Sequence, residues 1–225
     1  MDLNKKVDQL LEELKSGKFN KVILDSEKLL KKYPDKGYLQ NICGLAYQRL
    51  NNIKTSIFYF KKAIVLDPLN PGQKNNLANS YISLNEYDKA EGIFNEILDK
   101  NPNYTAAIVN YARLKNILLD FKNSIILYEK ATKLVKNDLG ICLNLASVYQ
   151  NSGNFKKANE LYKNILNHNP NYVPAHISIS KINNYHEDDL NLKQMLELNR
   201  KIKLNKREKS DLEFAIGKAY DDKKN

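Results

Sequence analysis

The sequence has no tryptophan, only two cysteines and no long run of apolar residues. Cys43 and Cys142 are too far apart in the chain to suggest the closely spaced pairs of a disulfide framework, and both are expected to be small core residues. No stretch reaches the roughly 20 apolar residues of a membrane helix, and no secretory signal pattern opens the chain. We therefore expect a soluble, cytoplasmic protein.

The motifs of nucleotide chemistry are also missing. The eight glycines are isolated, so neither a G-x-x-x-x-G-K-[ST] loop nor a G-x-G-x-x-G loop can form. The histidines are His168, His176 and His186, and no carboxylate or thiol has a spacing that would complete a metal site with them. We expect surface or packing histidines, no cofactor, and no catalysis by this chain alone.

Prolines are few, but their positions are periodic. Four of the six fall at multiples of 34, namely Pro34, Pro68, Pro102 and Pro170, and Lys136 stands at the missing position. Proline lacks a backbone donor and restricts the residue before it, so each of these prolines predicts the end of a helix. A period of this length indicates a repeat protein.

The apolar residues of each block recur at helical spacing in two runs. Short turns such as Asn51-Asn52 and Ser152-Gly153-Asn154 separate the runs, and Gly and Asn suit the left-handed conformation that ends a helix. We predict an all-α fold, an α-α superhelix of about six helix-turn-helix repeats with a C-terminal helix. The array covers residues 1–206, with blocks near 3–36, 37–70, 71–104, 105–138, 139–172 and a degenerate 173–206, and residues 207–225 open a further unit.

Short motifs within the blocks resemble the tetratricopeptide repeat (TPR), whose pattern is W-x2-L-G-x2-Y, then A-x3-F, then P. The first step reads Cys43-Gly44-x2-Tyr47 in block two, and the second reads Ala90 and Phe94 in block three. The tryptophan position is never Trp, and block four has Lys115 in place of the tyrosine. The resemblance covers residues 3–172, and it implies that the two helices of a pair come closest at the small residue of the pattern. These small residues are Gly44, Ala78, Ala112 and Ala146.

The last segment looks like the first helix of another repeat, because Ile216-Gly217-x2-Tyr220 restores the small-residue step. Ser210 is a suitable N-cap, so this helix is expected to begin at Ser210 or Asp211 after a basic link at 201–209. The sequence ends before a partner helix. We therefore expect an uncovered apolar face that frays or self-associates.

The tail also resembles one bacterial family, the tetratricopeptide-repeat sulfotransferases, in which a repeat array precedes a sulfotransferase domain. The resemblance rests on the Asp-rich stretch 185–189 and on the segment from Phe214 to Asp222, which reads FAIGKAYDD. It implies an array without its enzyme, since the family's Arg-Ser-Gly-Thr-Thr type donor loop is missing from this chain.

Asparagines recur on the first helices of blocks three to five, and the family resemblance implies that they face the concave surface. An amide offers both a donor and an acceptor, so a ladder of amides can pair with the backbone of an extended peptide. The alternative is that each asparagine bonds a neighbouring helix. The candidate peptide-binding residues are Asn76, Asn110, Asn144, Asn79, Arg113 and Ser147, with Asn41, Asn75, Arg49 and Asn151 around them.

The net charge of +10 is carried largely by lysines of the second helices, at positions that face outward in this type of repeat. Spread in this way they indicate a solvated face, whereas nucleic-acid binding needs a concentrated basic stripe with aromatics. They include Lys21, Lys54, Lys61, Lys62, Lys89, Lys122, Lys130, Lys156, Lys157 and Lys163.

The sequence thus favours a scaffold that binds a protein or extended peptide segment, with no nucleic acid and no membrane as partner. In the preferred interpretation it is the recognition arm of a sulfotransferase-type protein, whose catalytic domain would lie C-terminal to this region. The alternative is a free-standing adaptor for protein–protein interaction. A third interpretation, that the chain itself transfers sulfonate, lacks a donor-binding loop.

Overall fold

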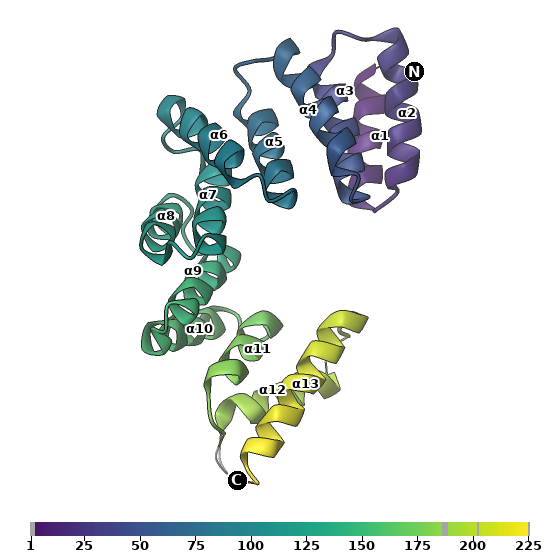
Figure 1. The fold of residues 1–225 in the computed structure, drawn as a ribbon. Helices are drawn as coiled ribbons and strands as arrows, with labels where there is room; N and C mark the ends of the chain where they lie inside the picture. The colour runs from purple at the N-terminus through teal and green to yellow at the C-terminus, as the bar shows by residue number, and fades with distance from the viewer. Residues whose placement is uncertain (1–2, 186–188, 202, 225) are drawn as a thin grey trace. The chain divides into compact units, whose positions relative to one another are not determined.

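The computed structural model describes residues 3–185, 189–201 and 203–224. All regular secondary structure in these ranges is α-helical (Figure 1). The helices are α1 (Leu3–Lys15), α2 (Phe19–Lys32), α3 (Gly37–Arg49), α4 (Ile53–Leu66), α5 (Pro71–Ser83), α6 (Tyr87–Lys100), α7 (Thr105–Ile117), α8 (Phe121–Leu134), α9 (Leu139–Asn151), α10 (Phe155–His168), α11 (Val173–Ile182), α12 (Leu190–Lys201) and α13 (Lys206–Asp222).

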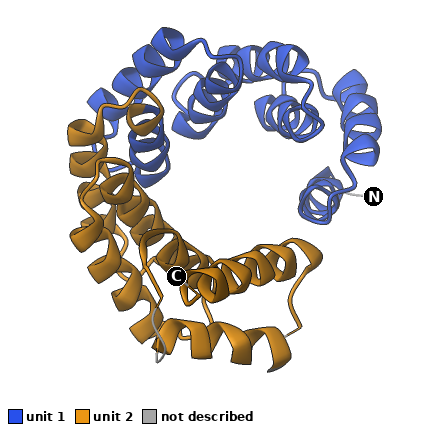
Figure 2. Ribbon diagram, turned by 60° about the horizontal axis from the view of Figure 1, so that its bottom comes forward, with its two compact units in different colours: residues 1–114 blue, residues 115–225 orange. Residues whose placement is uncertain are grey.

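Helices alternate in a fixed frame along the chain. First helices begin at residues 3, 37, 71, 105, 139 and 173, and each is followed by a second helix after a short connection. The predicted fold class, an all-α array of helix-turn-helix repeats, is confirmed. Residues 1–114 and 115–225 form two compact units, and the boundary falls within α7 (Figure 2). The division of the array at residue 206 stays a prediction.

The turn inside each of the first five blocks contains one residue with positive φ. Glycine and asparagine adopt this conformation at low cost, whereas a leucine is strained there. Block four is the exception to the glycine or asparagine pattern, because it uses Leu119. The five residues are Gly17 (φ 79°), Asn51 (60°), Asn85 (59°), Leu119 (60°) and Gly153 (79°).

Among the first five blocks, block four also lacks the closing proline that the other four have. Its second helix ends at Leu134, and the chain turns through Asn137, which has a φ of 62°. Asp138 then caps α9, since its carboxylate accepts a hydrogen bond from the backbone N–H of Ile141 at 2.9 Å. A left-handed asparagine and a side-chain cap therefore take the place of the missing proline.

The small residue of the repeat pattern lies at a close helix contact, as predicted. A Cβ atom added at Gly44 would lie 2.7 Å from the ring of Phe60, which is fully buried. The equivalent alanines Ala78, Ala112 and Ala146 are also fully buried. The aromatic that follows in each pair is buried as well. These aromatics are Phe60, Phe94, Tyr128 and Tyr162.

The C-terminal helix differs from the prediction. It begins at Lys206, four residues before Ser210, because Asn205 and Glu208 form a reciprocal capping box. The apolar face of α13 is also not left uncovered, since Leu212 and Ile216 join the core formed with α11 and α12. Phe214 stays exposed. The basic link is therefore shorter than expected, and residues 186–188 of the predicted Asp-rich stretch lie outside the described residues.

None of the helices in the described ranges is long and apolar enough to cross a bilayer.

Candidate functional site

The predicted peptide-binding residues lie on the first helices. Asn76 and Asn79 are on α5, Asn110 and Arg113 on α7, and Asn144 and Ser147 on α9. Within each pair the residues are three apart, so they share one face of their helix. These six positions are called the amide face below.

In residues 1–114 the structure joins the asparagines into pairs between successive first helices. The Asn76 side chain donates to Oδ1 of Asn41 at 3.0 Å, and the Asn110 side chain donates to Oδ1 of Asn75 at 2.9 Å. Arg113 donates to Oδ1 of Asn79 at 2.9 Å. These amides therefore bond a neighbouring helix, which is the alternative named from the sequence. They also lie at the surface, which the peptide-binding interpretation requires.

Pairing leaves each amide with hydrogen-bonding capacity to spare. An asparagine amide carries two N–H donors and an oxygen with two lone pairs, and each pair uses one of each. Asn76 and Asn110 are half-buried, so the second N–H donor and the oxygen of each amide remain within reach of a ligand. The pairs also hold the side chains in one orientation, which lowers the entropic cost of binding.

Unit 115–225 carries the amide face differently. Asn144 is exposed and Ser147 is half-buried on α9. The residue 35 positions before Asn144 is Val109, which has no amide to offer. Near the end of α9, Asn151 donates to Oδ1 of Asn116 at 3.2 Å. An amide pair therefore recurs in this unit about one helical turn after Ser147.

A second polar cluster in unit 1–114 was not predicted. The carboxylate of Glu27 accepts hydrogen bonds from Tyr47 at 2.9 Å and Tyr59 at 2.8 Å, and the two rings stack at 5.4 Å. Burial and the hydrogen bond to Glu27 raise the pKa of Tyr47 to about 12 and also raise that of Tyr59. The periodic tyrosine of the motif was visible in the sequence, but its partner on α2 was not.

Cys43 lies beside this cluster. Burial raises the pKa of its thiol to about 12, so the reactive thiolate is not populated at neutral pH. Both cysteines are free thiols, and Cys142 is only half-buried, so the core prediction holds for Cys43 alone. Nucleophilic chemistry at either position has no support.

His176 is fully buried between α11 and α12. Its Nε2 donates to the carbonyl of Pro170 at 2.8 Å, and its Nδ1 lies against the side-chain oxygen of Asn191. Asn191 also donates to the hydroxyl of Tyr185 at 2.6 Å. His168 bonds the backbone carbonyl of Asn164 on its own helix, and His186 lies outside the described residues. Within the described ranges no three metal-binding side chains come together.

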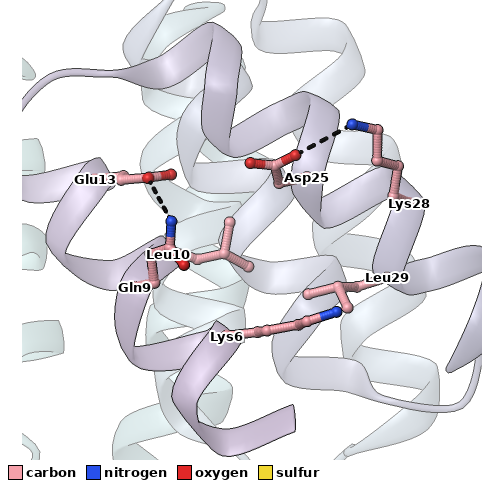
Figure 3. Close-up of a pocket in the computed structure, with 7 residues that line it drawn as sticks. All are labelled: Lys6, Gln9, Leu10, Glu13, Asp25, Lys28 and Leu29. Atoms are coloured by element: carbon pink, nitrogen blue, oxygen red, sulfur yellow. Dashed lines mark hydrogen bonds and ion pairs between the residues drawn. The ribbon is translucent and has the colours of Figure 1, made fainter. Parts of the chain in front are cut away.

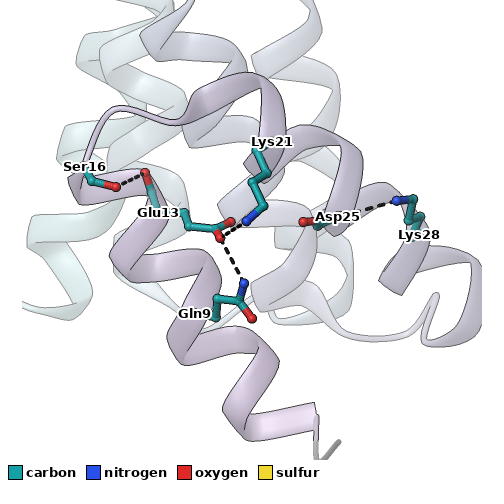
Figure 4. A network of polar contacts seen from close by, with 6 residues as sticks. All are labelled: Gln9, Glu13, Ser16, Lys21, Asp25 and Lys28. Carbon is teal, nitrogen blue, oxygen red and sulfur yellow. Dashed lines mark hydrogen bonds and ion pairs between the residues drawn. The ribbon is translucent and has the colours of Figure 1, made fainter.

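A cavity of about 220 Å³ opens between α1 and α2, with Leu10 and Leu29 in its wall (Figure 3). Glu13 accepts hydrogen bonds from Gln9 at 2.9 Å and from Lys21, and the hydrogen bond from Lys21 holds the pKa of the carboxyl below its usual range (Figure 4). The other carboxylate oxygen of Glu13 is buried without a partner among the described residues.

In block two, two of the positions equivalent to the wall of this cavity hold aromatic side chains. Thirty-four residues after Glu13 and Asp25 stand Tyr47 and Tyr59, which pack against Glu27 of the preceding helix. Block one has polar residues on that face instead, as is common in the first repeat of an array. The cavity is therefore explained by the repeat architecture.

The outward lysines lie where the sequence predicted. Nine of the ten are exposed, and Lys130 is half-buried. They are distributed over all five second helices from α2 to α10 rather than gathered in one stripe. This distribution favours a solvated surface over a nucleic-acid interface.

Three segments of the chain match family profiles described as tetratricopeptide repeat. They are residues 40–68, 76–104 and 141–171. No curated protein sequence matches the chain at a significant level.

Solved structures of the same fold cover most of the chain. A structure titled for pilF of Pseudomonas aeruginosa superposes with a TM-score of 0.71 over 94% of this chain and 96% of that chain, at 16% identity. A thermophilic TPR protein from Thermus thermophilus gives 0.70 over 80% and 97%, at 15% identity. A tetratricopeptide repeat protein from Parabacteroides merdae gives 0.67 over 96% and 79%, at 15% identity. At this level of identity the likeness establishes the fold alone.

Proposed function

We propose that this chain, which contains tetratricopeptide repeats, is a protein-binding scaffold that holds an extended peptide segment along its amide face. Arrays of this fold serve in general as surfaces for protein–protein interaction. The observation that carries the proposal is the recurrence of half-buried, pre-oriented amides on successive first helices, as in Asn76 and Asn110.

The chemistry of the amide face suits the backbone of a peptide. Each amide supplies one remaining donor and one remaining acceptor, which match the carbonyl and N–H groups of an extended chain. Arg113 is the one charged residue among the six positions. A partner is therefore held through its main chain, and no strong charge requirement is imposed on its side chains.

The test begins with peptides selected on the full chain from a random-peptide display library. The variant Asn76→Ala/Asn110→Ala/Asn144→Ala is expected to bind the selected peptides about tenfold more weakly, because three pairs of backbone hydrogen bonds are lost. Affinity is measured by fluorescence anisotropy, and helicity and melting by circular dichroism.

A matched control separates binding from structure. Asn41→Ala/Asn75→Ala removes the partners of Asn76 and Asn110, and with them the same interhelix bonds, but leaves the proposed binding amides in place. We expect this variant to lose clearly less affinity than the triple variant, because it loses only the pre-orientation of Asn76 and Asn110 and not their hydrogen bonds to the peptide. Equal losses in the two variants, or unchanged binding in the triple variant, would show that the amides are structural only.

A more specific function is that of the recognition arm of a sulfotransferase-type protein. What favours it is the tail segment from Phe214 to Asp222, whose sequence is similar to that family's residues before the catalytic domain. The downstream DNA provides the test. A continuing frame that encodes a strand, a glycine-rich loop and a helix supports the recognition arm, whereas a stop codon with no such frame nearby supports a free-standing adaptor.

Sulfonate transfer by the chain itself is tested by calorimetry with a 3′-phosphoadenosine donor. We expect no binding, because the sequence has no donor loop.

A further inference from the structure

The second helix of block two carries an open cavity that is separate from the amide face. It has a volume of about 440 Å³, and its wall includes the apolar side chains of Phe58, Val65 and Leu66. Its polar residues are Gln40 of α3 and the pair Lys61 and Lys62 of α4. A mostly apolar cavity of this size with a few polar groups is typical of a ligand or peptide site.

Large apolar side chains are exposed here, and Val65 and Leu69 are more exposed than Phe58. Val65 is 81% exposed and Phe58 is 52% exposed, and Leu69 in the turn after α4 is 82% exposed. Exposed apolar groups on one surface mark interaction sites more often than scattered ones do.

The other repeats act as internal controls for this surface. The position of Val65 is held by a polar or charged residue in blocks one, three, four and five, and so is the position of Leu69. The residues equivalent to Val65 are Lys31, Asp99, Lys133 and Asn167, and those equivalent to Leu69 are Asp35, Asn103, Asn137 and Asn171. The fold of the repeat therefore does not need apolar side chains at these two positions.

Gln40 adds an unused hydrogen-bonding group. Its side chain is 7% exposed, and Oε1 is buried without a hydrogen-bond partner among the described residues. In block three the equivalent residue, Lys74, forms an ion pair with Glu96 at 2.6 Å. Block two has Lys62 at the position of Glu96, so this internal pair is lost. A half-turn of the amide exchanges its oxygen and nitrogen, and either can then face an occupant.

Charge decides what kind of occupant fits. Helix α4 contains no acidic residue, and both lysines at the cavity are exposed. Lys62 lies over the ring of Phe58 at 4.3 Å, which places positive charge directly beside the apolar wall. We propose that this cavity is a docking site for an acidic segment of a partner protein, which inserts one large apolar side chain between Phe58 and Val65 while its carboxylates face Lys61 and Lys62.

The test uses the isotopically labelled full chain and nuclear magnetic resonance. The probe is an acetylated and amidated peptide of sequence Glu-Glu-Leu-Tyr-Glu-Glu, and its counterpart is Lys-Lys-Leu-Tyr-Lys-Lys. The acidic peptide is expected to give saturable shifts at the backbone amides of Phe58, Val65 and Leu69, and the basic peptide none. The triple asparagine variant is expected to retain this binding, so failure of the amide-face proposal and failure of this one are distinguishable.

Val65→Asp supplies the decisive variant, because the equivalent residue Asp99 shows that the repeat accommodates an acid there. We expect it to weaken binding of the acidic peptide at least about tenfold, a factor that corresponds to 1.4 kcal/mol. The matched control Asn167→Asp adds the same charge at the equivalent position of α10 and is expected to change binding less than about twofold, since it lies on another helix.

Four outcomes would overturn the proposal. They are the absence of saturable shifts at millimolar peptide, equal binding of the basic peptide, equal effects of the two variants, and a dimer or vesicle-bound form that Val65→Asp abolishes. The last result would identify a second copy or a lipid surface as the occupant instead.

Discussion

Polar side chains connect successive helices in both units, but they do so in contrasting ways. In residues 1–114 successive first helices are connected by repeated amide pairs near the surface, such as Asn41 with Asn76, in addition to the half-buried cluster around Glu27. In residues 115–225 the last three helices include a buried cluster in which Asn191 bonds both His176 and Tyr185. Surface hydrogen bonds contribute little each, whereas the loss of one member of a buried cluster leaves its partners unsatisfied. We therefore expect single substitutions at the surface amide pairs to cost less stability than substitutions in the buried cluster of α11–α13.

The largest expected effect comes from breaking the buried cluster. Asn191→Leu removes the partner of His176 and of Tyr185, and it is expected to destabilise helices α11–α13 by about 3 kcal/mol. Asn199→Leu makes the same change on the same helix at a buried oxygen without a partner among the described residues, so it is expected to be neutral or slightly stabilising. Chemical denaturation measures the free energy, and hydrogen exchange shows which unit opens. Equal losses in the two variants would contradict the special role of the cluster.

A smaller loss is expected at the closest helix contact of unit 1–114. Gly44→Ala places a Cβ atom against the ring of Phe60 and is expected to cost about 1–2 kcal/mol by overpacking. Gly92→Ala, on α6, meets no atom within 4 Å and is expected to stabilise by about 0.5–1 kcal/mol through higher helix propensity. If both alanines stabilise the chain, α3 and α4 are not held at a fixed distance.

A tyrosine in each unit is expected to make the free energy of unfolding depend on pH in the alkaline range. The pKa of Tyr47 is raised to about 12, and so is that of Tyr185, in both cases mainly by burial. A raised pKa favours the protonated folded state, so this part of the stability is complete below about pH 10 and is lost as the pH rises toward 12. Tyr47→Phe is expected to reduce the alkaline loss in unit 1–114, and Tyr185→Phe the loss in unit 115–225. Denaturation midpoints across this range check both, and an unchanged slope in either variant contradicts its assignment.

The smallest expected effect concerns the turn of block four. Leu119 has a φ of 60° where the other blocks use glycine or asparagine. Leu119→Asn is expected to stabilise by about 0.5–1 kcal/mol, because asparagine adopts this conformation with less strain. Melting by circular dichroism measures the gain. Asn85→Leu, the reverse change at the equivalent turn of block three, is expected to cause a similar loss.

The frame of the fold was readable from the sequence because its signals are local. Pro68 and Pro102 stand just after the ends of α4 and α6, and Asn51 and Gly153 mark the turns. The start of α13 was missed although the signal was present, since Asn205 and Glu208 have the spacing of a capping box.

The candidate site was only partly predictable, because hydrogen-bond partners depend on the rotation between neighbouring helices. Asn76 and Asn110 were placed on one face by their period, but their bonds go to residues 35 positions earlier, a register that the 34-residue period alone does not give. A comparison of the residues equivalent to Val65 in the other blocks would have predicted an exposed apolar side chain at this position. Only the structure shows that Val65 borders a cavity together with Gln40.

The most direct test of the proposed scaffold function asks whether the amide face binds the main chain of a peptide. A selected peptide, its form with alternate backbone nitrogens methylated, and its alanine-substituted forms are compared by fluorescence anisotropy against the full chain. We expect methylation on the bound edge to weaken affinity about tenfold or more, because each blocked N–H loses its partner amide, while most alanine substitutions have little effect. Full affinity of the methylated peptide together with strong losses from single alanine substitutions would contradict the proposal.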